Sequence, residues 1–192
     1  MSPRHVLDFW FLPEGSAGHG GQRAEWFRKD DAFDAAIAQS FGALIDQAVA
    51  GGLHEWDQQG PRGVLARILL LDQFTRNARR GSPAAFAGDP LALGAARELV
   101  ERGADAQLTA VERVFAYLPF EHAEDAAMQE RSVELFSALA AGDAAFAGVL
   151  DYAHRHREVI RRFGRFPHRN PILQRASTLA EVDYLAQPGS GF

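Results

Sequence analysis

Apolar residues recur every three or four positions along most of the chain, a spacing that is typical of amphipathic α-helices. A long stretch of this kind lies between Asp31 and Ala50, where one side of a helix would be apolar. Residues 61–74 are apolar around most of the helical circumference, which predicts a central, buried helix. No stretch alternates convincingly with period two, so the pattern predicts an all-α protein.

Prolines, glycines and capping residues mark where the helices begin and end. Thr109 and Thr178 are each followed three residues later by a glutamate, which is the spacing of a capping box. Pro119 is expected to end one helix and to place the start of the next near Glu121. About eight helices are predicted, not counting a short helical segment at Trp26 and Phe27. They are Pro3 to Phe11, Asp31 to Ala50, Pro61 onward, Asp89 to Gly103, Thr109 to Leu118, Glu121 to Leu139, Ala144 to Phe163, and a short one after Thr178.

The length of 192 residues fits one domain, with residues 187–192 as a frayed tail. Short loops between the helices predict antiparallel helix pairs. The sequence contains no clean copy of the repeat of about 34 residues that marks tetratricopeptide proteins. The expected fold is therefore a tetratricopeptide-like helical array without clean sequence repeats.

The composition excludes several classes of function. The chain has no cysteine, so thiol catalysis, thiolate metal sites and disulfides are excluded. With 20 basic and 25 acidic residues the net charge is −5, which disfavours nucleic-acid binding. No run approaches the roughly 18 to 20 apolar residues that span a bilayer, so we expect no membrane segment and a cytoplasmic location. Lys29 is the only lysine, so a bound anion would meet mainly arginine.

Three stretches place polar residues where a hydrophobic core is expected. The first is LLLDQFTRN, residues 69–77. Asp72 and Arg76 are four positions apart, so they share one face of the helix and could form a pair. An isolated carboxylate beside so many leucines would be costly to bury. The stretch therefore predicts either a buried ion pair that joins helices or a binding site.

The second stretch, residues 117–132, combines aromatic residues with four acids and a histidine. With Glu121 and His122 at a helix start, backbone N–H groups and the helix dipole would favour an anion there. The acids also fit the ordinary bias of a first helical turn. His122 is either a proton carrier or a capped histidine in the core.

The third stretch, residues 151–173, is rich in arginine and histidine. His154, Arg157 and Arg161 would share one face of a helix, and His156 lies too far around it to chelate an ion with His154. Two prolines stiffen the loop that follows, and loops held on a rigid scaffold often carry functional residues. The polar residues of this loop are Arg165, His168, Arg169 and Asn170.

Segments in a fixed order carry a resemblance to a known family. They include VLDFWF, WFRKDDAFDAAI, DQFTRN, RGSPAAFAGDPLAL, YLPFEHAEDAAMQERSVELF and RHREVIRRFGRFPHRN. From about residue 4 to residue 186 the chain strongly resembles the bacterial family called domain of unknown function 924. The resemblance implies an all-α, tetratricopeptide-like protein and supports grouping the three polar stretches into one site. It implies no particular reaction, and Thr75 stands where the family usually has proline.

We therefore expect one polar site for a small carboxylate or phosphate, and a hydrolase or lyase is the most concrete activity. The candidate catalytic residues are His122, Glu121 and Asp72. The candidate ligand-binding residues are Arg76, Asn77, Arg157, Arg165, His168, Arg169 and Asn170. No cofactor is expected.

Three other readings fit the same residues. A helical scaffold could use its arginines to bind an acidic peptide or a C-terminal carboxylate of a protein partner. A metal site could form from His122, Glu121, His154 and His168, although no common ligand spacing is present. Finally, the three stretches could satisfy one another as a buried ion network with no ligand.

Overall fold

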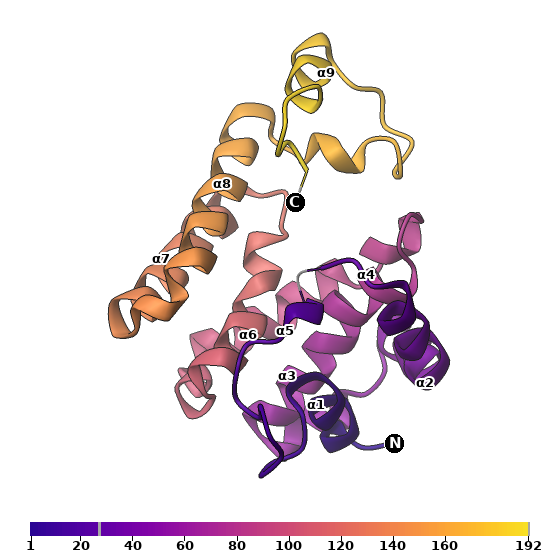
Figure 1. Cartoon of the computed structure of the whole chain (residues 1–192), viewed down its shortest axis with the longest axis vertical. Helices are drawn as coiled ribbons and strands as arrows, with labels where there is room; N and C mark the ends of the chain where they lie inside the picture. Colours follow the sequence, from indigo (N-terminus) through magenta and orange to yellow (C-terminus); the bar gives the residue numbers. More distant parts are fainter. Residues whose placement is uncertain (27, 192) are drawn as a thin grey trace. The chain divides into compact units, whose positions relative to one another are not determined.

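The computed structural model describes all residues except 27 and 192, and within this part the chain is helical with no β-strand. The all-α class expected from the sequence is confirmed, whereas the tetratricopeptide-like arrangement stays a prediction. The α-helices, shown in Figure 1, are α1 (Pro3–Phe11), α2 (Asp31–Val49), α3 (Pro61–Leu69), α4 (Thr75–Ala78), α5 (Asp89–Glu101), α6 (Ala110–Glu121), α7 (Ala126–Gly142), α8 (Ala147–Phe163) and α9 (Leu179–Leu185).

The helices form two compact units. The first comprises Met1–Arg80 and Ala84–Pro119, and therefore contains α1 to α5 and most of α6. The second comprises Gly81–Pro83 and the chain from Phe120 onward, and contains the last two residues of α6 together with α7, α8 and α9. The single domain expected from the sequence stays a prediction.

The first unit is built around α3, which packs against α1 and α5. Leu65, Ile68 and Leu69 of α3 are completely buried, which confirms the central helix expected from its all-round apolar surface. The helix does not stop at its end: one π-helical turn, Leu70–Phe74, leads directly into α4. Aromatic rings of α1 and α2 pack against this segment, with the ring centres of Trp10 and Phe41 at 5.3 and 5.0 Å from that of Phe74.

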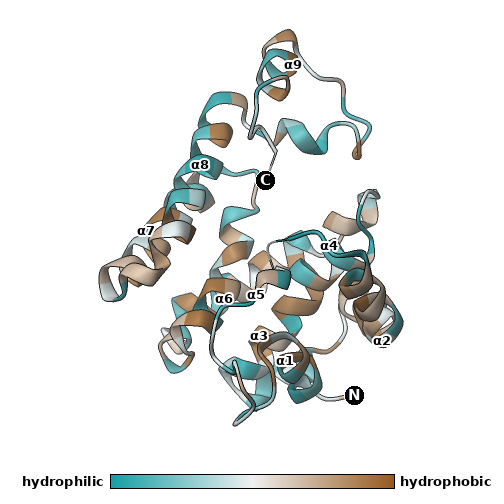
Figure 2. Ribbon diagram, in the orientation of Figure 1, coloured by the Kyte–Doolittle hydropathy of each residue, from teal (hydrophilic) through white to brown (hydrophobic). Residues whose placement is uncertain are grey.

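The second unit contains the antiparallel pair α7 and α8, which lie side by side along their lengths (Figure 1). Figure 2 shows that hydrophobic and hydrophilic residues alternate along α8, as expected for a helix with one buried face. Val159 and Ile160 of α8 pack with the completely buried Phe166, and Tyr184 of α9 packs against the same cluster. The C-terminal segment is thus tied to the end of α8.

Two expected helix boundaries were wrong. Pro119 does not end its helix but lies inside α6, which continues to Glu121. The proline is in the last turn, where it removes only one backbone hydrogen bond. The next helix begins at Ala126, and its cap is Asp125, whose carboxylate accepts a hydrogen bond from the N–H of Met128 at 2.9 Å.

Other expected boundaries agree with the structure. The two capping boxes form, with the side chain of Glu112 accepting from the N–H of Thr109 and that of Glu181 accepting from the N–H of Thr178. A 3₁₀ turn, Ala24–Trp26, stands at the expected short helix, of which Phe27 lies outside the described residues. No helix in the described part of the chain is long and apolar enough to cross a membrane.

Candidate functional site

The first unit contains an ion cluster around Asp72, whose side chain is 0% exposed. Arg76 donates to the Asp72 carboxylate at 2.9 Å, which confirms the pairing expected from their spacing, and it binds Asp89 through two further hydrogen bonds of 2.8 and 3.0 Å. Burial alone would lower the pKa of Arg76, but the charges of Asp72 and Asp89 outweigh it and raise the pKa above its ordinary value. The guanidinium is therefore a permanent charge shared by two carboxylates.

A close backbone approach sets the geometry of this cluster. A Cβ atom on Gly88 would lie 2.2 Å from the carbonyl oxygen of Leu71, so only glycine allows the start of α5 to meet the π-helical turn. This contact places Asp89, the next residue, opposite Arg76. The neighbouring Asn77 donates to Asp34 at 2.7 Å, and the same carboxylate accepts two hydrogen bonds from Arg80.

The second unit contains a cluster of three histidines and one arginine at the end of α6. Glu121 is the last residue of α6 and His122 follows it. The sequence predicted both residues at the N-terminus of a helix, and this prediction was wrong. The backbone here is held by side chains: Gln129 of α7 donates to the carbonyl oxygens of Glu121 and Ala123 at 2.7 and 2.8 Å. These bonds satisfy carbonyl groups that a helix end leaves without an intrahelical partner.

Arg169 completes the hold on this helix end. Its Nη2 atom donates to the carbonyl oxygen of His122 at 3.0 Å, a position where a cation also suits the helix dipole. The guanidinium lies 4.5 Å from the centre of the Phe166 ring, and the residue is only 7% exposed. His168, two residues after Phe166, packs its ring 5.6 Å from the same phenylalanine.

His156 of α8 enters the cluster from the opposite side and is 4% exposed. Its Nδ1 atom lies 2.9 Å from the carbonyl oxygen of Tyr152 and 3.2 Å from Oε1 of Glu121. Its ring centre is 6.3 Å from that of His122 and 5.4 Å from that of Phe166. Two imidazoles and a guanidinium thus contact one buried phenylalanine, and the ring of His122 lies next to that of His156.

Two of these imidazoles are neutral at ordinary pH. Burial, with the neighbouring His122 second, lowers the pKa of His156 to about 3. Burial and the charge of Arg169 lower the pKa of His168 to about 4. The contact between Glu121 and His156 therefore involves a neutral imidazole, while Arg169 carries a full positive charge.

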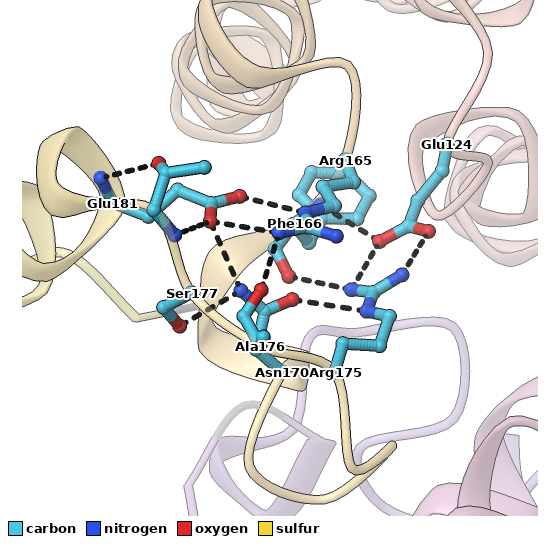
Figure 3. A network of polar contacts seen from close by, with 9 residues as sticks. Glu124, Arg165, Phe166, Asn170, Arg175, Ala176, Ser177 and Glu181 are labelled. Carbon is cyan, nitrogen blue, oxygen red and sulfur yellow. Dashed lines mark hydrogen bonds and ion pairs between the residues drawn. The ribbon is translucent and has the colours of Figure 1, made fainter.

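A second set of polar contacts fixes the loop that carries His168 and Arg169 (Figure 3). Glu124 accepts a hydrogen bond from the backbone N–H of Phe166 at 2.7 Å and two from Arg175 at 2.6 and 2.9 Å. Burial alone would raise the pKa of Glu124, but these partners outweigh it, so the pKa lies below its ordinary value. Arg175 also binds the side-chain oxygen of Asn170 at 2.9 Å and the backbone oxygen of Phe166 at 3.0 Å.

The other end of the loop is held by Glu181 of α9. Its carboxylate accepts hydrogen bonds of 2.7 and 2.8 Å from Arg165 and one of 3.4 Å from Asn170 (Figure 3). The hydrogen bonds from Arg165 lower the pKa of Glu181 to about 2. Arg165 and Asn170 therefore support the loop from within the unit.

The structure places the candidate residues in two groups. Asp72, Arg76 and Asn77 lie in the first unit, where Arg76 binds the carboxylates of Asp72 and Asp89 and Asn77 donates to the carboxylate of Asp34. In the second unit, Glu121, His122, His168 and Arg169 gather at the histidine cluster. Arg157 lies outside this cluster's core and pairs with Glu130 of α7 at 3.1 Å, as Arg161 does at 2.6 Å. That both groups form one pocket stays a prediction.

Among the described residues, no three histidine, aspartate or glutamate side chains are arranged so that they could hold a metal ion. The metal site considered from the sequence therefore has no matching geometry in this part of the chain. His154, one of its proposed ligands, lies exposed on α8. Residues two positions apart on an α-helix point to nearly opposite sides, so His154 is exposed while His156 is buried.

Sequence reasoning missed His156 as a member of the site. A signal was present, because His156 lies three residues after Ala153 and three and four residues before Val159 and Ile160, which all belong to the buried face of α8. A histidine on an apolar helix face needs a polar partner, and Glu121 supplies it. The partners Glu124 and Arg175 are 51 residues apart, and no local pattern connects them.

Comparisons with known proteins agree with the resemblance seen in the sequence. The model of a family described as "Bacterial protein of unknown function (DUF924)" matches residues 6–189. A solved structure, that of the protein of unknown function ATU0120 from Agrobacterium tumefaciens, shares 40% sequence identity, with a TM-score of 0.82 and 96% of each chain covered. The search of curated proteins gave no significant match.

Proposed function

The chain belongs to the DUF924 family of bacterial proteins, and we propose that its second unit binds a small anionic molecule, a carboxylate or phosphate. The binding groups are the imidazoles of His122 and His168 and the guanidinium of Arg169. We also propose a cytoplasmic location, which a chain without cysteine fits.

The observation that carries this proposal is the combination of a buried guanidinium with imidazoles whose pKa values are lowered. An anion about 4 Å from an imidazolium contributes roughly 4 kcal/mol at an effective dielectric constant near 20. This free energy corresponds to about three pH units in the titration midpoint of the imidazole. The anion and a proton would therefore bind together, and each would strengthen the other.

A site of this kind suits acid–base chemistry, and a hydrolase or lyase is the activity we propose. A bound anion would bring an imidazole close to the pH range in which it can both accept and donate a proton. Arg169 would hold the anionic group of the substrate, and His122 or His168 would exchange the proton. Asp72 is left out of this site, because its carboxylate is engaged by Arg76 in the first unit.

The alternative is a scaffold that binds an acidic peptide. It has less support, because the arginines that would bind such a peptide already have carboxylate partners. Glu130 engages Arg157 and Arg161, Glu181 engages Arg165, and Glu124 engages Arg175. A peptide would have to displace these contacts before it gained its own.

A thermal-shift titration of the full-length protein with inorganic phosphate, acetate and succinate at about pH 6 tests the proposal. A ligand at about 100 times its dissociation constant adds about 2.7 kcal/mol of stability. At this chain length that gain moves the melting midpoint by roughly 5 to 10 °C. Loss of the shift in Arg169→Gln would support the site.

The matched control is Arg97→Gln, which removes one arginine from an exposed pair with Glu101 in the first unit. It should respond to the anion as the wild type does. If Arg169→Gln does not fold, His122→Gln serves instead. This change removes an imidazole that is proposed to bind the anion, and it keeps the His122 backbone oxygen that accepts from Arg169. No shift with any of the three anions, or equal shifts in all variants, would refute the proposal.

A further inference from the structure

One side of α8 carries charged residues that face solvent. They lie four, three and four positions apart, and we call them the α8 charge stripe: Asp151, Arg155, Glu158 and Arg162. With 3.6 residues per turn, these positions fall within about 60° of one another around the helix. Arg155 is partly exposed and the other three residues are exposed, whereas the buried Ala153 and Ile160 lie on the opposite side of α8.

Neighbouring aromatic rings hold the two arginines of the stripe in place. The Cζ atom of Arg155 lies 4.8 Å from the centre of the Tyr152 ring. The Cζ atom of Arg162 lies 4.7 Å from the ring centre of Phe163 and 5.8 Å from that of Tyr184. Cation–π contacts restrict a long side chain but leave its own charge in place. The two arginines would therefore lose less side-chain freedom when they bind a partner.

The acids of the stripe do not form the ion pairs that their spacing allows. Asp151 and Glu158 each lie four residues before an arginine of the stripe, a favourable spacing for a pair within one helix. Among the residues that the structure describes, neither acid has an ion-pair partner. Glu130 of α7 differs, because it binds both Arg157 and Arg161 on another side of α8. The stripe thus presents two carboxylates to a partner molecule.

The order of charges along the stripe is self-complementary. A two-fold axis midway between residues 156 and 157 would place Asp151 opposite Arg162 of a second copy, because both residues are equally far from that point. The same axis would place Arg155 opposite Glu158 of the second copy. An antiparallel pair of α8 helices therefore matches every acid with an arginine, whereas a parallel pair in register brings like charges together. Alternate steps of four and three residues also keep the stripe along the contact line of two helices that cross at a small angle.

We propose that the α8 charge stripe binds a second copy of this chain, with the two α8 helices antiparallel about a two-fold axis. Tyr152, which is 49% exposed beside Arg155, adds aromatic surface of the kind that is enriched in interfaces. Most of the contact is polar and exposed, so the dimer is weak and reversible, and salt weakens it. The inference is independent of the anion site, because the stripe lies on the side of α8 away from the buried His156.

Sedimentation of the full-length protein at rising concentrations, up to about 1 mM, tests this surface. We expect a monomer–dimer equilibrium at about 0.02 M NaCl. At about 0.5 M NaCl the charges are screened within a few ångströms, so the dissociation constant should rise by about tenfold or more.

Charge reversal tests whether the stripe forms the contact. Asp151→Arg would face Arg162 of the second copy, and the two-fold axis repeats this repulsion, so the dissociation constant should rise by about tenfold or more. Adding Arg162→Glu restores opposite charges and should return the constant to within about threefold of the wild-type value. The matched control is Glu98→Arg, which reverses an exposed glutamate of α5 in the first unit and should leave dimerisation unchanged.

Three results would overturn the proposal. A protein that stays monomeric at every concentration and at both salt concentrations would show that the stripe is only a solvated surface. A dimer that Asp151→Arg does not weaken, or one that high salt strengthens, would have its contact elsewhere. The anion site is judged separately, by the thermal-shift titration.

Discussion

Replacing His156 with glutamine should make the protein less sensitive to acid. The imidazole is buried and its pKa is lowered from the ordinary value of 6.5 to about 3, first by burial and then by His122. In the unfolded chain the same group would titrate at its ordinary value. Between these two values the unfolded state binds a proton that the folded state does not, so the free energy of unfolding falls as the pH falls.

The magnitude follows from the two pKa values. Above about pH 7 neither state holds the proton and His156 has no effect on the pH dependence. At about pH 5 the pH lies about one and a half units below the unfolded-state pKa. At about 1.36 kcal/mol per unit, protonation of the unfolded chain lowers the free energy of unfolding by ~2 kcal/mol. Near pH 3 the full difference, about 5 kcal/mol, is reached. His168, with its pKa lowered to about 4, adds a loss in the same direction.

Urea unfolding of the full-length protein at about pH 7.5 and pH 5 measures this loss. We expect the wild type to lose ~2 kcal/mol more between these two conditions than His156→Gln does. His154→Gln is the matched control, since this exposed histidine lies on the same helix two residues away. Equal losses in wild type and His156→Gln would show that the imidazole is not held neutral in the folded state.

Three further outcomes follow from the contacts described above. Gly88→Ala should lower the free energy of unfolding by about 1–3 kcal/mol, because the new Cβ would lie 2.2 Å from the backbone oxygen of Leu71. Gly94→Ala is the control, since a Cβ there would meet open space and should not destabilise the protein. Asp72→Asn should lose about 2–4 kcal/mol in urea unfolding, because it leaves a buried guanidinium with one carboxylate fewer; an unchanged midpoint would contradict the buried pair. Glu124→Gln should speed amide exchange of Phe166 by about tenfold or more, since a charge-assisted hydrogen bond contributes roughly 1.5–3 kcal/mol, and unaltered exchange would mean that Glu124 does not hold the loop.

Local signals in the sequence were enough to predict much of the fold. The spacing of apolar residues predicted the central helix, because a helix buried over most of its surface requires apolar side chains on most of its faces. The capping boxes at Thr109 and Thr178 formed because each involves residues only three positions apart. The pair of Asp72 and Arg76 was likewise predictable from one helical turn.

The candidate site was less predictable, because its geometry depends on contacts between distant segments. A proline in the last turn of a helix costs one hydrogen bond, so Pro119 could not show from sequence whether α6 continues to Glu121. The helix end was then misplaced, and with it the environment of His122. His156 becomes a site residue only through Glu121, which is 35 positions away in the sequence and brought near by the packing of the second unit.

The arginines of the second unit differ in how their charge is used, and this difference narrows the search for a ligand. Arg157, Arg165 and Arg175 each have a carboxylate within 3.1 Å, so their charge is balanced inside the unit. Arg169 donates to the backbone oxygen of His122 and stacks on the ring of Phe166. Burial first, and the positive charge of Arg169 as a lesser cause, lower the pKa values of His156 and His168 beside it. A bound anion would offset the charge of Arg169 and favour a proton on these imidazoles, so the ligand and the proton are expected at one place.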